Sequence, residues 1–450
     1  MNTAQGQVKA VLAFRKGFKS APRVPISEMQ AQSFRERRVK APTLISNIEI
    51  PCPDPAEDEA LRDWLWSLYK AKGEGLEKLD PPLPSVSYKG EWIGVENEVK
   101  DSGSLQPSVG EHETFKAIQA SSTSDVTLFY LSGGAWFRAG PPGARPLHTQ
   151  LCNRSGSPVF TFQYRLVPQH TLPTLLLDVL VAYFYLLSPP PGSFHEPIDP
   201  EKLILVGESG GANLHLHLLQ VLQSLNRSAG PTLRFNGRDV PTVMPKGCAF
   251  ISPAADLVLS LPSVKKFESF DWLSEGAPWL QPNFPADDIW PSNPPRGDLH
   301  CDNSALCHPL IDPSTCTDWT GMPPMWIAAG EETFADGIKF LVNSLKASGV
   351  PVTFVQYQSM PHVWNVVMPF LPQSQHVMKL WGEACRSLAE GTAQTSATYF
   401  VTLGALKMLP AGFARLLDLP DDEILRRMRA ARDRLAKFVW KGPESKDAKL

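Results

Sequence analysis

Leu203-Ile204-Leu205-Val206-Gly207-Glu208-Ser209-Gly210-Gly211 is the stretch of the chain that decides its fold. The four apolar residues at its start predict a buried strand, and a helical stretch follows from Ala212. Ser209 has glycine two places before it and two places after it, which is the G-x-S-x-G pattern of a tight strand-to-helix turn, the nucleophile elbow. Side chains at the flanking positions would clash in such a turn, and glycine has none. The turn predicts that Ser209 Oγ is held at the top of a sheet, where the amides of the next helix favour negative charge.

The residues after the turn support this interpretation. Their apolar side chains recur at helical spacing on one face, at Leu214, Leu218, Val221, Leu222 and Leu225. The alternative is a glycine-rich turn whose serine has no catalytic role. The other parts of the sequence decide between these two interpretations. His215 and His217 lie two residues apart and point in different directions, so we interpret them as polar-face or packing residues.

Composition describes an ordinary globular protein. The 450 residues are 43% hydrophobic and 20% charged, which fits one large domain with insertions or two smaller domains. A formal charge of −3 gives no basic footprint for nucleic acid. The seven cysteines are scattered in no zinc-binding pattern, so we expect reduced thiols and neither a metal nor a cofactor.

The sequence predicts no membrane span, because no run of 18 apolar residues occurs. Basic residues precede the first acid, Glu28, and superficially resemble a mitochondrial presequence. A solvated basic helix is the favoured interpretation. We therefore expect a soluble cytoplasmic protein, with a mitochondrial presequence as the weaker alternative.

Short apolar runs alternate with helical stretches from about residue 126. The predicted strands are 126–131, 159–164, 203–206, 248–251, 325–329 and 352–357. The predicted helices are 172–187, 212–225, 335–348 and 375–389. This alternation predicts an α/β fold, with a mostly parallel central sheet flanked by helices on both faces.

Two regions do not follow this alternation of strands and helices, and they suggest a cap. We assign residues 1–95 to an N-terminal cap or lid region and 96–392 to the catalytic domain, in which the insertion 256–302 contributes to the cap. The insertion aromatics either line an apolar substrate pocket or only pack the cap: Phe267, Phe270, Trp272, Trp279, Phe284 and Trp290. We assign 393–450 to a C-terminal helical extension. Its amphipathic helix, 424–439, is expected to dock on the core, with a partner protein or a membrane surface as alternatives.

Acids and a histidine follow two later strands. Glu331, Glu332 and Asp336 follow the strand 325–329, and His362 follows the strand 352–357. A nucleophilic serine needs a base, and the base needs an orienting acid. The order serine, acid, histidine, each beyond its own strand, matches this requirement at the carboxyl edge of a parallel sheet.

A glycine pair upstream predicts an oxyanion hole. Gly133 and Gly134 close the strand 126–131, and glycine lets the backbone approach a substrate carbonyl closely. We expect their amides to act with the amide of Gly210. The alternative is a plain Gly-Gly turn.

With these segments assembled, the chain resembles the hormone-sensitive-lipase-like branch of the α/β-hydrolases. The further matches are Tyr164-Arg165-Leu166-Val167-Pro168, which is similar to the motif Y-R-L-A-P; Ile251-Ser252-Pro253 through Asp256 and Leu257, which is similar to S-P-x-x-D-L; and Met322-Pro323-Pro324 before the acid strand. The resemblance covers about residues 95–390. Ser132 and Ala135 depart from the H-G-G-G loop of the family, and Thr333 and Phe334 depart from the acid loop in packing only.

The resemblance implies a role for each matched residue. Ser209 is the nucleophile, and His362 acts as general base and then as general acid. The family acid lies four residues before a second Asp; because Asp336 fits that second position, Glu332 is the catalytic carboxylate and Glu331 the fallback. The family oxyanion hole maps onto Gly133, Gly134 and Gly210.

These inferences predict a serine hydrolase that cleaves a short-acyl or acetyl ester of a bulky apolar small molecule, such as a natural product of secondary metabolism. Alternatives with the same acyl-enzyme are an acyltransferase, a lactonase or a cyclase. A non-catalytic small-molecule receptor is disfavoured because Ser209, Glu332 and His362 are all present. A scaffold role of the C-terminal helix is a further alternative, and association into a homodimer stays open.

Overall fold

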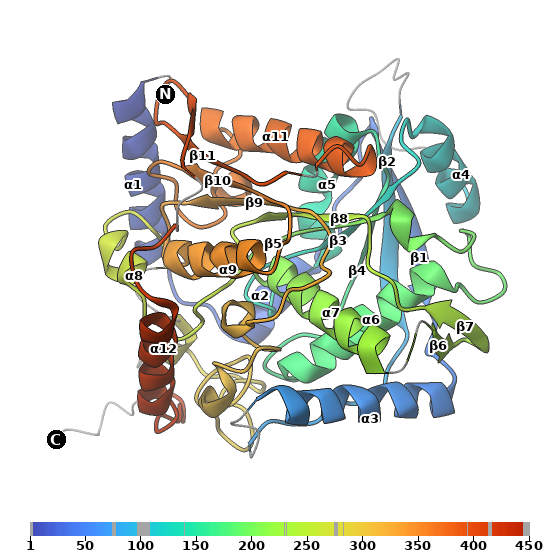
Figure 1. The fold of residues 1–450 in the computed structure, drawn as a ribbon, viewed down its shortest axis with the longest axis horizontal. Helices are drawn as coiled ribbons and strands as arrows, with labels where there is room; N and C mark the ends of the chain where they lie inside the picture. Colours follow the sequence, from blue (N-terminus) through green and yellow to red (C-terminus); the bar gives the residue numbers. More distant parts are fainter. Residues whose placement is uncertain are drawn as a thin grey trace.

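The computed structural model describes residues 3–73, 78–96, 109–138, 140–228, 230, 232–273, 278–281, 283–393, 395–412 and 416–443. In these residues, ten strands form one sheet that crosses the molecule (Figure 1). The spatial order of the strands is β1 (Thr43–Ile50), β2 (Tyr88–Val95), β4 (Val159–Phe162), β3 (Thr127–Leu131), β5 (Leu203–Glu208), β8 (Gly247–Ile251), β9 (Met325–Gly330), β10 (Val352–Tyr357), β11 (Ala397–Val401) and β12 (Met408–Pro410).

The sheet is mostly parallel, as predicted. All neighbouring pairs from β4 through β11 are parallel, whereas β1, β2 and β12 join antiparallel at the two edges. Every residue of β5 is buried, as expected for a central parallel strand covered on both faces. Its side chains alternate: Leu203 and Leu205 pack into one hydrophobic core, and Ile204 and Val206 into the other.

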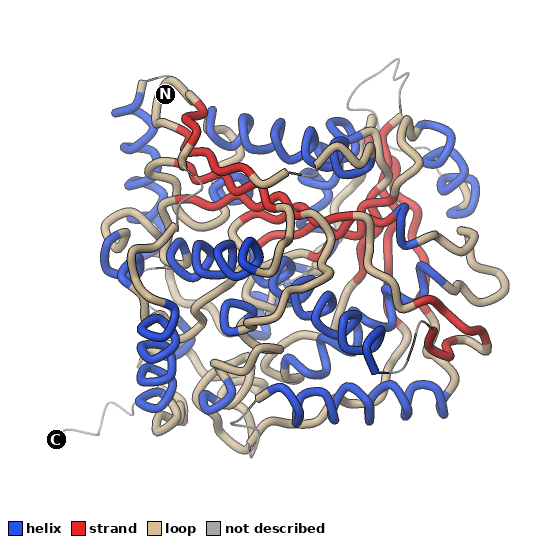
Figure 2. Tube along the Cα trace, viewed as in Figure 1, coloured by secondary structure: helices blue, strands red, loops and turns tan. Residues whose placement is uncertain are grey.

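Helices cover both faces of the sheet (Figures 1 and 2). α5 (Pro141–Ser155) and α11 (Pro372–Ala389) cover one face, and α6 (Leu172–Leu187), α7 (Ser209–Ser228) and α9 (Ala335–Ala347) cover the other. The remaining helices are α1 (Ala4–Ser20), α2 (Ile26–Ser33), α3 (Pro55–Lys72), α4 (Glu111–Ser121), α8 (Pro262–Lys266), α10 (Trp364–Val367) and α12 (Asp421–Leu435). A small hairpin, β6 (Thr232–Phe235) with β7 (Arg238–Pro241), lies outside the main sheet.

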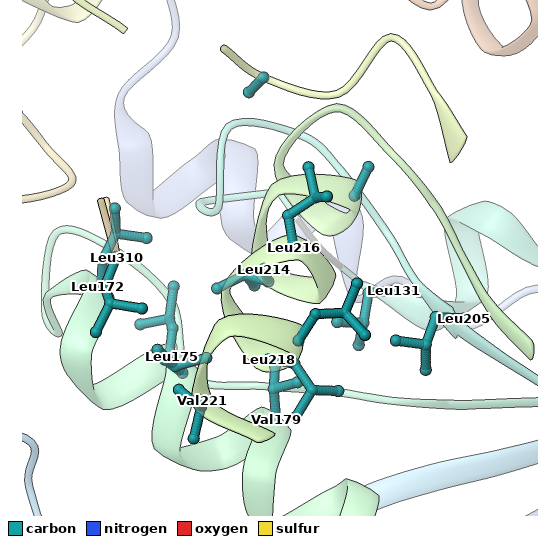
Figure 3. Close-up of a cluster of buried hydrophobic side chains, with 14 of the residues drawn as sticks. Leu131, Leu172, Leu175, Val179, Leu205, Leu214, Leu216, Leu218, Val221 and Leu310 are labelled. Carbon is teal, nitrogen blue, oxygen red and sulfur yellow. The ribbon is translucent and has the colours of Figure 1, made fainter. Parts of the chain in front are cut away.

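The helix α7 after the elbow is buried on nearly all sides. Figure 3 shows its leucines against α6 and the strands, with Leu131, Leu172, Leu175, Val179, Leu205, Leu214, Leu216, Leu218, Val221 and Leu310 labelled. The histidines of this helix are packing residues: His215 and His217 are fully buried, and His215 Nε2 lies 3.1 Å from the carbonyl oxygen of Phe129. Burial lowers the pKa of His215 to about 3, so its ring is neutral.

Both ends of the sheet are formed by segments that the sequence analysis assigned to the cap region and to the C-terminal helical extension. β1 and β2 lie within 1–95, and β11 and β12 lie within 393–450, so neither segment is only a cap or only a helical extension. The physical reason is that these strands lie at, or next to, the two edges of the sheet. β1 buries its side chains unevenly, and β12 is three residues long, so neither carries a strong periodic signal.

The C-terminal helix docks on the rest of the chain, as expected. Ile424 and Met428 of α12 are fully buried, and Asn303 Nδ2 donates to the carbonyl oxygen of Leu435 at 2.8 Å. Beyond the helix, the Trp440 ring stacks on Trp290 of the insertion, with centroids 5.3 Å apart. Among the described helices, none has both the length and the apolar character that crossing a bilayer requires.

Candidate active site

Ser209 is the first residue of α7, directly after β5, and its backbone is strained. Its φ is +50°, a left-handed conformation that non-glycine residues rarely adopt. The neighbouring backbone explains why glycine is needed on both sides. A Cβ atom at Gly211 would lie 2.0 Å from the carbonyl oxygen of Leu131, and one at Gly207 would lie 2.8 Å from the same oxygen. The turn therefore packs directly against the end of β3 and presents Ser209 at the carboxyl edge of the sheet.

Two hydrogen-bond contacts join Ser209, His362 and Glu332. His362 Nε2 lies 2.8 Å from Ser209 Oγ, and His362 Nδ1 lies 2.8 Å from Glu332 Oε1. Ser209 is 8% exposed, His362 2% and Glu332 0%. The structure thus brings together three residues that the sequence places beyond three different strands. In this arrangement an imidazole can accept the serine proton while a carboxylate holds the opposite ring nitrogen.

The three candidate acids have different partners. Glu331 accepts a hydrogen bond from the backbone amide of Ser359 at 2.9 Å. Asp336 accepts one from the amide of Ser263 at 2.9 Å and lies 3.9 Å from the Lys339 ammonium group. Of these three carboxylates, Glu332 is the one that contacts His362.

Both oxygens of Glu332 have donors. Oε1 faces His362, and Oε2 accepts from Ser252 Oγ at 2.6 Å and from the Gly330 amide at 2.8 Å. Ser252 follows β8, the strand next to β9 in the sheet, and its φ of +47° is also left-handed. Partners at both oxygens fix the orientation of this carboxylate.

The loop after β3 differs from the prediction at one position. The Gly133 amide donates to Glu208 Oε1 at 2.8 Å, so it is already occupied and is not free to hold an oxyanion. Glu208 directly precedes the nucleophile candidate. Within the described residues, the amides of Gly134, Ala135 and Gly210 donate no hydrogen bond. These three amides, rather than that of Gly133, are the available donors.

Side chains outside the predicted set hold this loop in place. Ala135 and Trp136 both have positive φ, at +49° and +56°. Trp136 Nε1 donates to the carbonyl oxygen of Gly210 at 3.0 Å, and Tyr164 Oη donates to that of Ser132 at 2.7 Å. Sequence reasoning missed Trp136. Its only sequence signal is its place two residues after the glycine pair.

A model of the alpha/beta hydrolase fold family matches residues 128–366, more than half of the chain. The chain belongs to the alpha/beta hydrolase fold family. The matched range runs from β3 to α10 and includes every residue that the sequence predicts for the site. The family resemblance and the fold class predicted from the sequence are confirmed.

Two relatives align with this chain over most of their own length. The chain is 29% identical to an acetyl-hydrolase from Streptomyces hygroscopicus over 277 residues, which are 61% of this chain and 80% of the relative. It is 26% identical to an esterase from Acinetobacter venetianus over 274 residues, 60% of this chain and 78% of the relative. These matches support the prediction of a carboxylic ester hydrolase.

Solved structures of esterases share the fold. A crystal structure of an esterase/lipase from an uncultured bacterium matches with a TM-score of 0.54 and 19% identity, and covers 85% of this chain and 98% of its own. An esterase of the bacterial hormone-sensitive lipase family matches with a TM-score of 0.54 and 18% identity, at the same coverage.

Glu208 is a second buried acid in this hydrolase site, and sequence reasoning missed its role. Its Oε2 accepts a hydrogen bond from the Tyr130 hydroxyl, and its Oε1 accepts from Gly133. Burial raises the pKa of the Glu208 carboxyl to about 7, although both hydrogen bonds favour its charged form and oppose the rise. Through these two hydrogen bonds, Glu208 links the elbow to β3 and to the glycine loop that follows it.

Aromatic rings surround His362. The Phe334 ring centroid lies 5.2 Å and the Trp272 centroid 5.8 Å from that of the imidazole. Of the six insertion aromatics, Trp290 and Phe284 are buried and contact Trp440, which shows that they pack the insertion. Among the described residues, no group of three or more His, Cys, Asp and Glu side chains has an arrangement that could hold a metal ion.

Proposed function

We propose that this protein is a serine carboxylester hydrolase in which Ser209 is the nucleophile, His362 the general base and Glu332 the acid that orients it. The observation that carries the proposal is the pair of 2.8 Å contacts from the two imidazole nitrogens to Ser209 Oγ and Glu332 Oε1. In the first step Ser209 Oγ attacks the ester carbonyl carbon while His362 Nε2 takes the hydroxyl proton. The resulting imidazolium is stabilised by the Glu332 carboxylate.

The negative charge formed on the carbonyl oxygen needs donors that are already in place. The amides of Gly134, Ala135 and Gly210 fill this role in our proposal, because they belong to the loop and helix start beside Ser209 and lack other acceptors among the described residues. When the intermediate collapses, His362 donates its proton to the departing alkoxide and an acyl-Ser209 ester remains. A water molecule, deprotonated by His362, then attacks the acyl carbon and releases the acid. These steps use protein groups and water alone.

The proposed substrate is a short-acyl ester, such as an acetate, of a bulky apolar alcohol. The name of the acetyl-hydrolase relative supports the short acyl group. The Phe334 ring beside His362 supports an apolar alcohol, because this ring is only partly buried and offers apolar surface at the site. In this proposal the N-terminal helices and the insertion 256–302 form the cap over the substrate.

Burst kinetics with 4-nitrophenyl acetate test this function. We expect a rapid release of one nitrophenolate per enzyme molecule, followed by slower turnover as acyl-Ser209 hydrolyses. A Ser209→Ala variant should show neither phase, and full activity in that variant would refute the assignment. Rates for acetate, butyrate and octanoate esters test the acyl preference. Product analysis with added alcohols separates hydrolysis from acyl transfer.

A further inference from the structure

Two consecutive residues of the insertion hold the backbone of His362 from both sides. Asp271 Oδ1 accepts a hydrogen bond from the His362 amide at 3.3 Å, and Trp272 Nε1 donates one to the His362 carbonyl oxygen at 2.9 Å. The backbone N–H and C=O of one residue are thus both bound by side chains that lie about 90 positions earlier in the chain. Neither residue belongs to the strand that leads to His362.

The same carboxylate also binds the loop that carries Glu332. Asp271 Oδ2 accepts a hydrogen bond at 2.5 Å from the amide of Thr333, the residue directly after Glu332. Asp271 is fully buried, so water does not compete for these contacts. One carboxylate therefore connects the acid loop and the histidine loop, whose relative position decides the length of the Glu332–His362 hydrogen bond.

The histidine loop requires such support because its backbone is strained. Ser359 and Val363 both have left-handed φ angles, +55° and +45°, and Val363 is β-branched. Residues in this conformation persist only where the surrounding structure holds them. The hydrogen bonds to the backbone amide and carbonyl groups of His362 supply that restraint, because His362 lies between the two strained residues.

Helix α1 holds the segment that contains Asp271 and Trp272. Arg15 Nε donates to the Asp271 carbonyl oxygen at 3.2 Å, and Arg15 Nη2 donates to that of Glu268 at 2.7 Å. The Phe18 ring packs edge-on against Trp272, with centroids 5.0 Å apart. The segment is therefore fixed between the N-terminal helix on one side and His362 on the other.

We infer that Asp271 and Trp272 are positioning residues for His362: they set where the imidazole stands between Ser209 and Glu332, without touching substrate. The inference rests on the proposed function, because it assigns these residues to the same reaction. Misplacement of a reacting group by about 1 Å is enough to slow an enzyme roughly a hundredfold. Loss of the hydrogen bonds from Asp271 or Trp272 to the His362 backbone should therefore lower kcat and leave KM almost unchanged.

The test compares Asp271→Ala, Asp271→Asn and Trp272→Phe in the full-length protein. Each variant is titrated with a fluorophosphonate to count reactive sites, and kcat is expressed per titrated site. We expect kcat per site to fall about tenfold to a hundredfold in D271A. D271N should lose less, because its amide keeps one acceptor oxygen, and W272F should lose several-fold, with KM within about twofold in every variant.

Two matched controls remove similar groups elsewhere in the insertion. Trp290→Phe deletes an indole N–H that donates to the Trp279 carbonyl oxygen, and Asp287→Asn alters a carboxylate that accepts from the amides of Ser27, Ile289 and Trp290. Both controls should keep wild-type kcat per site even where the melting temperature falls.

A structural role alone would lower the number of titrated sites in the Asp271 and Trp272 variants while each remaining site turned over at the wild-type rate. That result would overturn the inference and leave the proposed triad intact. Full labelling and turnover in Ser209→Ala would instead refute the proposed function itself.

Discussion

Ser252 Oγ donates a 2.6 Å hydrogen bond to Glu332 Oε2, on the side of the carboxylate that faces away from His362. The two residues follow neighbouring parallel strands, β8 and β9, and parallel strands bring their carboxyl ends to one edge of the sheet. The fold therefore supplies the proposed orienting acid with a partner that fixes its rotamer.

Replacement of Ser252 by Ala should weaken that orientation without removing the acid. A hydrogen bond to a charged group contributes about 1.5–3 kcal/mol, so kcat should fall roughly tenfold to a hundredfold. Steady-state kinetics at constant pH measure the effect. An unchanged kcat would show that the Gly330 amide alone is enough to orient Glu332.

Glu332→Gln and Glu331→Gln form a matched pair of neighbouring acids. Removal of the charge beside His362 should lower kcat by about 10³–10⁴, as expected when the orienting acid of a triad is neutralised. E331Q weakens one hydrogen bond to the Ser359 amide and should lower kcat by less than about tenfold. Equal losses in the two variants would argue against Glu332 as the orienting acid.

Gly133→Ala tests the packing between the glycine loop and the elbow. A Cβ atom there would lie 2.8 Å from the Glu208 carbonyl oxygen and 2.9 Å from Ser209 Cβ, so the loop must move. We expect a loss of about tenfold to a hundredfold in kcat. Gly143→Ala is the control, because a Cβ there meets nothing within 4 Å, and its activity should match the wild type. A G133A enzyme as active as G143A would contradict the proposed fit.

Glu208 should make stability depend on pH. Its pKa rises from the ordinary 4.5 to about 7 in the folded protein, so the folded state keeps a proton that the unfolded state releases between these values. The free energy of unfolding should therefore decrease as pH rises from 4.5 to 7, by on the order of 3 kcal/mol at most from this group. Glu208→Gln removes that slope. Denaturant melts of both proteins across pH 4.5–8 measure it, and parallel curves would contradict the shift.

The spacing of apolar residues along the sequence predicted the central strand and the helix that follows it. The apolar run 203–206 and the leucines after Ser209 are consistent with one central strand and one buried helix, and both are present. The edge strands β1 and β12 were not predicted, because pairing with a neighbour stabilises them more than their own periodicity does.

The site was predictable where residue type and order carry the chemistry. Ser209 and His362 follow from a motif and from a position after a strand, whereas the choice of Glu332 among three nearby acids rested on the family resemblance. The hydrogen bond of the Gly133 amide could not be predicted, because its acceptor, Glu208, becomes its neighbour only in the folded chain. Asp271 and Trp272 left no sequence signal for their contacts with His362, since they meet it across about 90 positions.

The most direct test of the central claim is mass spectrometry of the protein after reaction with a fluorophosphonate. We expect one adduct, on the peptide that contains Ser209, at a rate that falls by orders of magnitude in His362→Ala because the serine then lacks its base. An adduct on another residue, or a His362→Ala variant labelled as fast as the wild type, would contradict it.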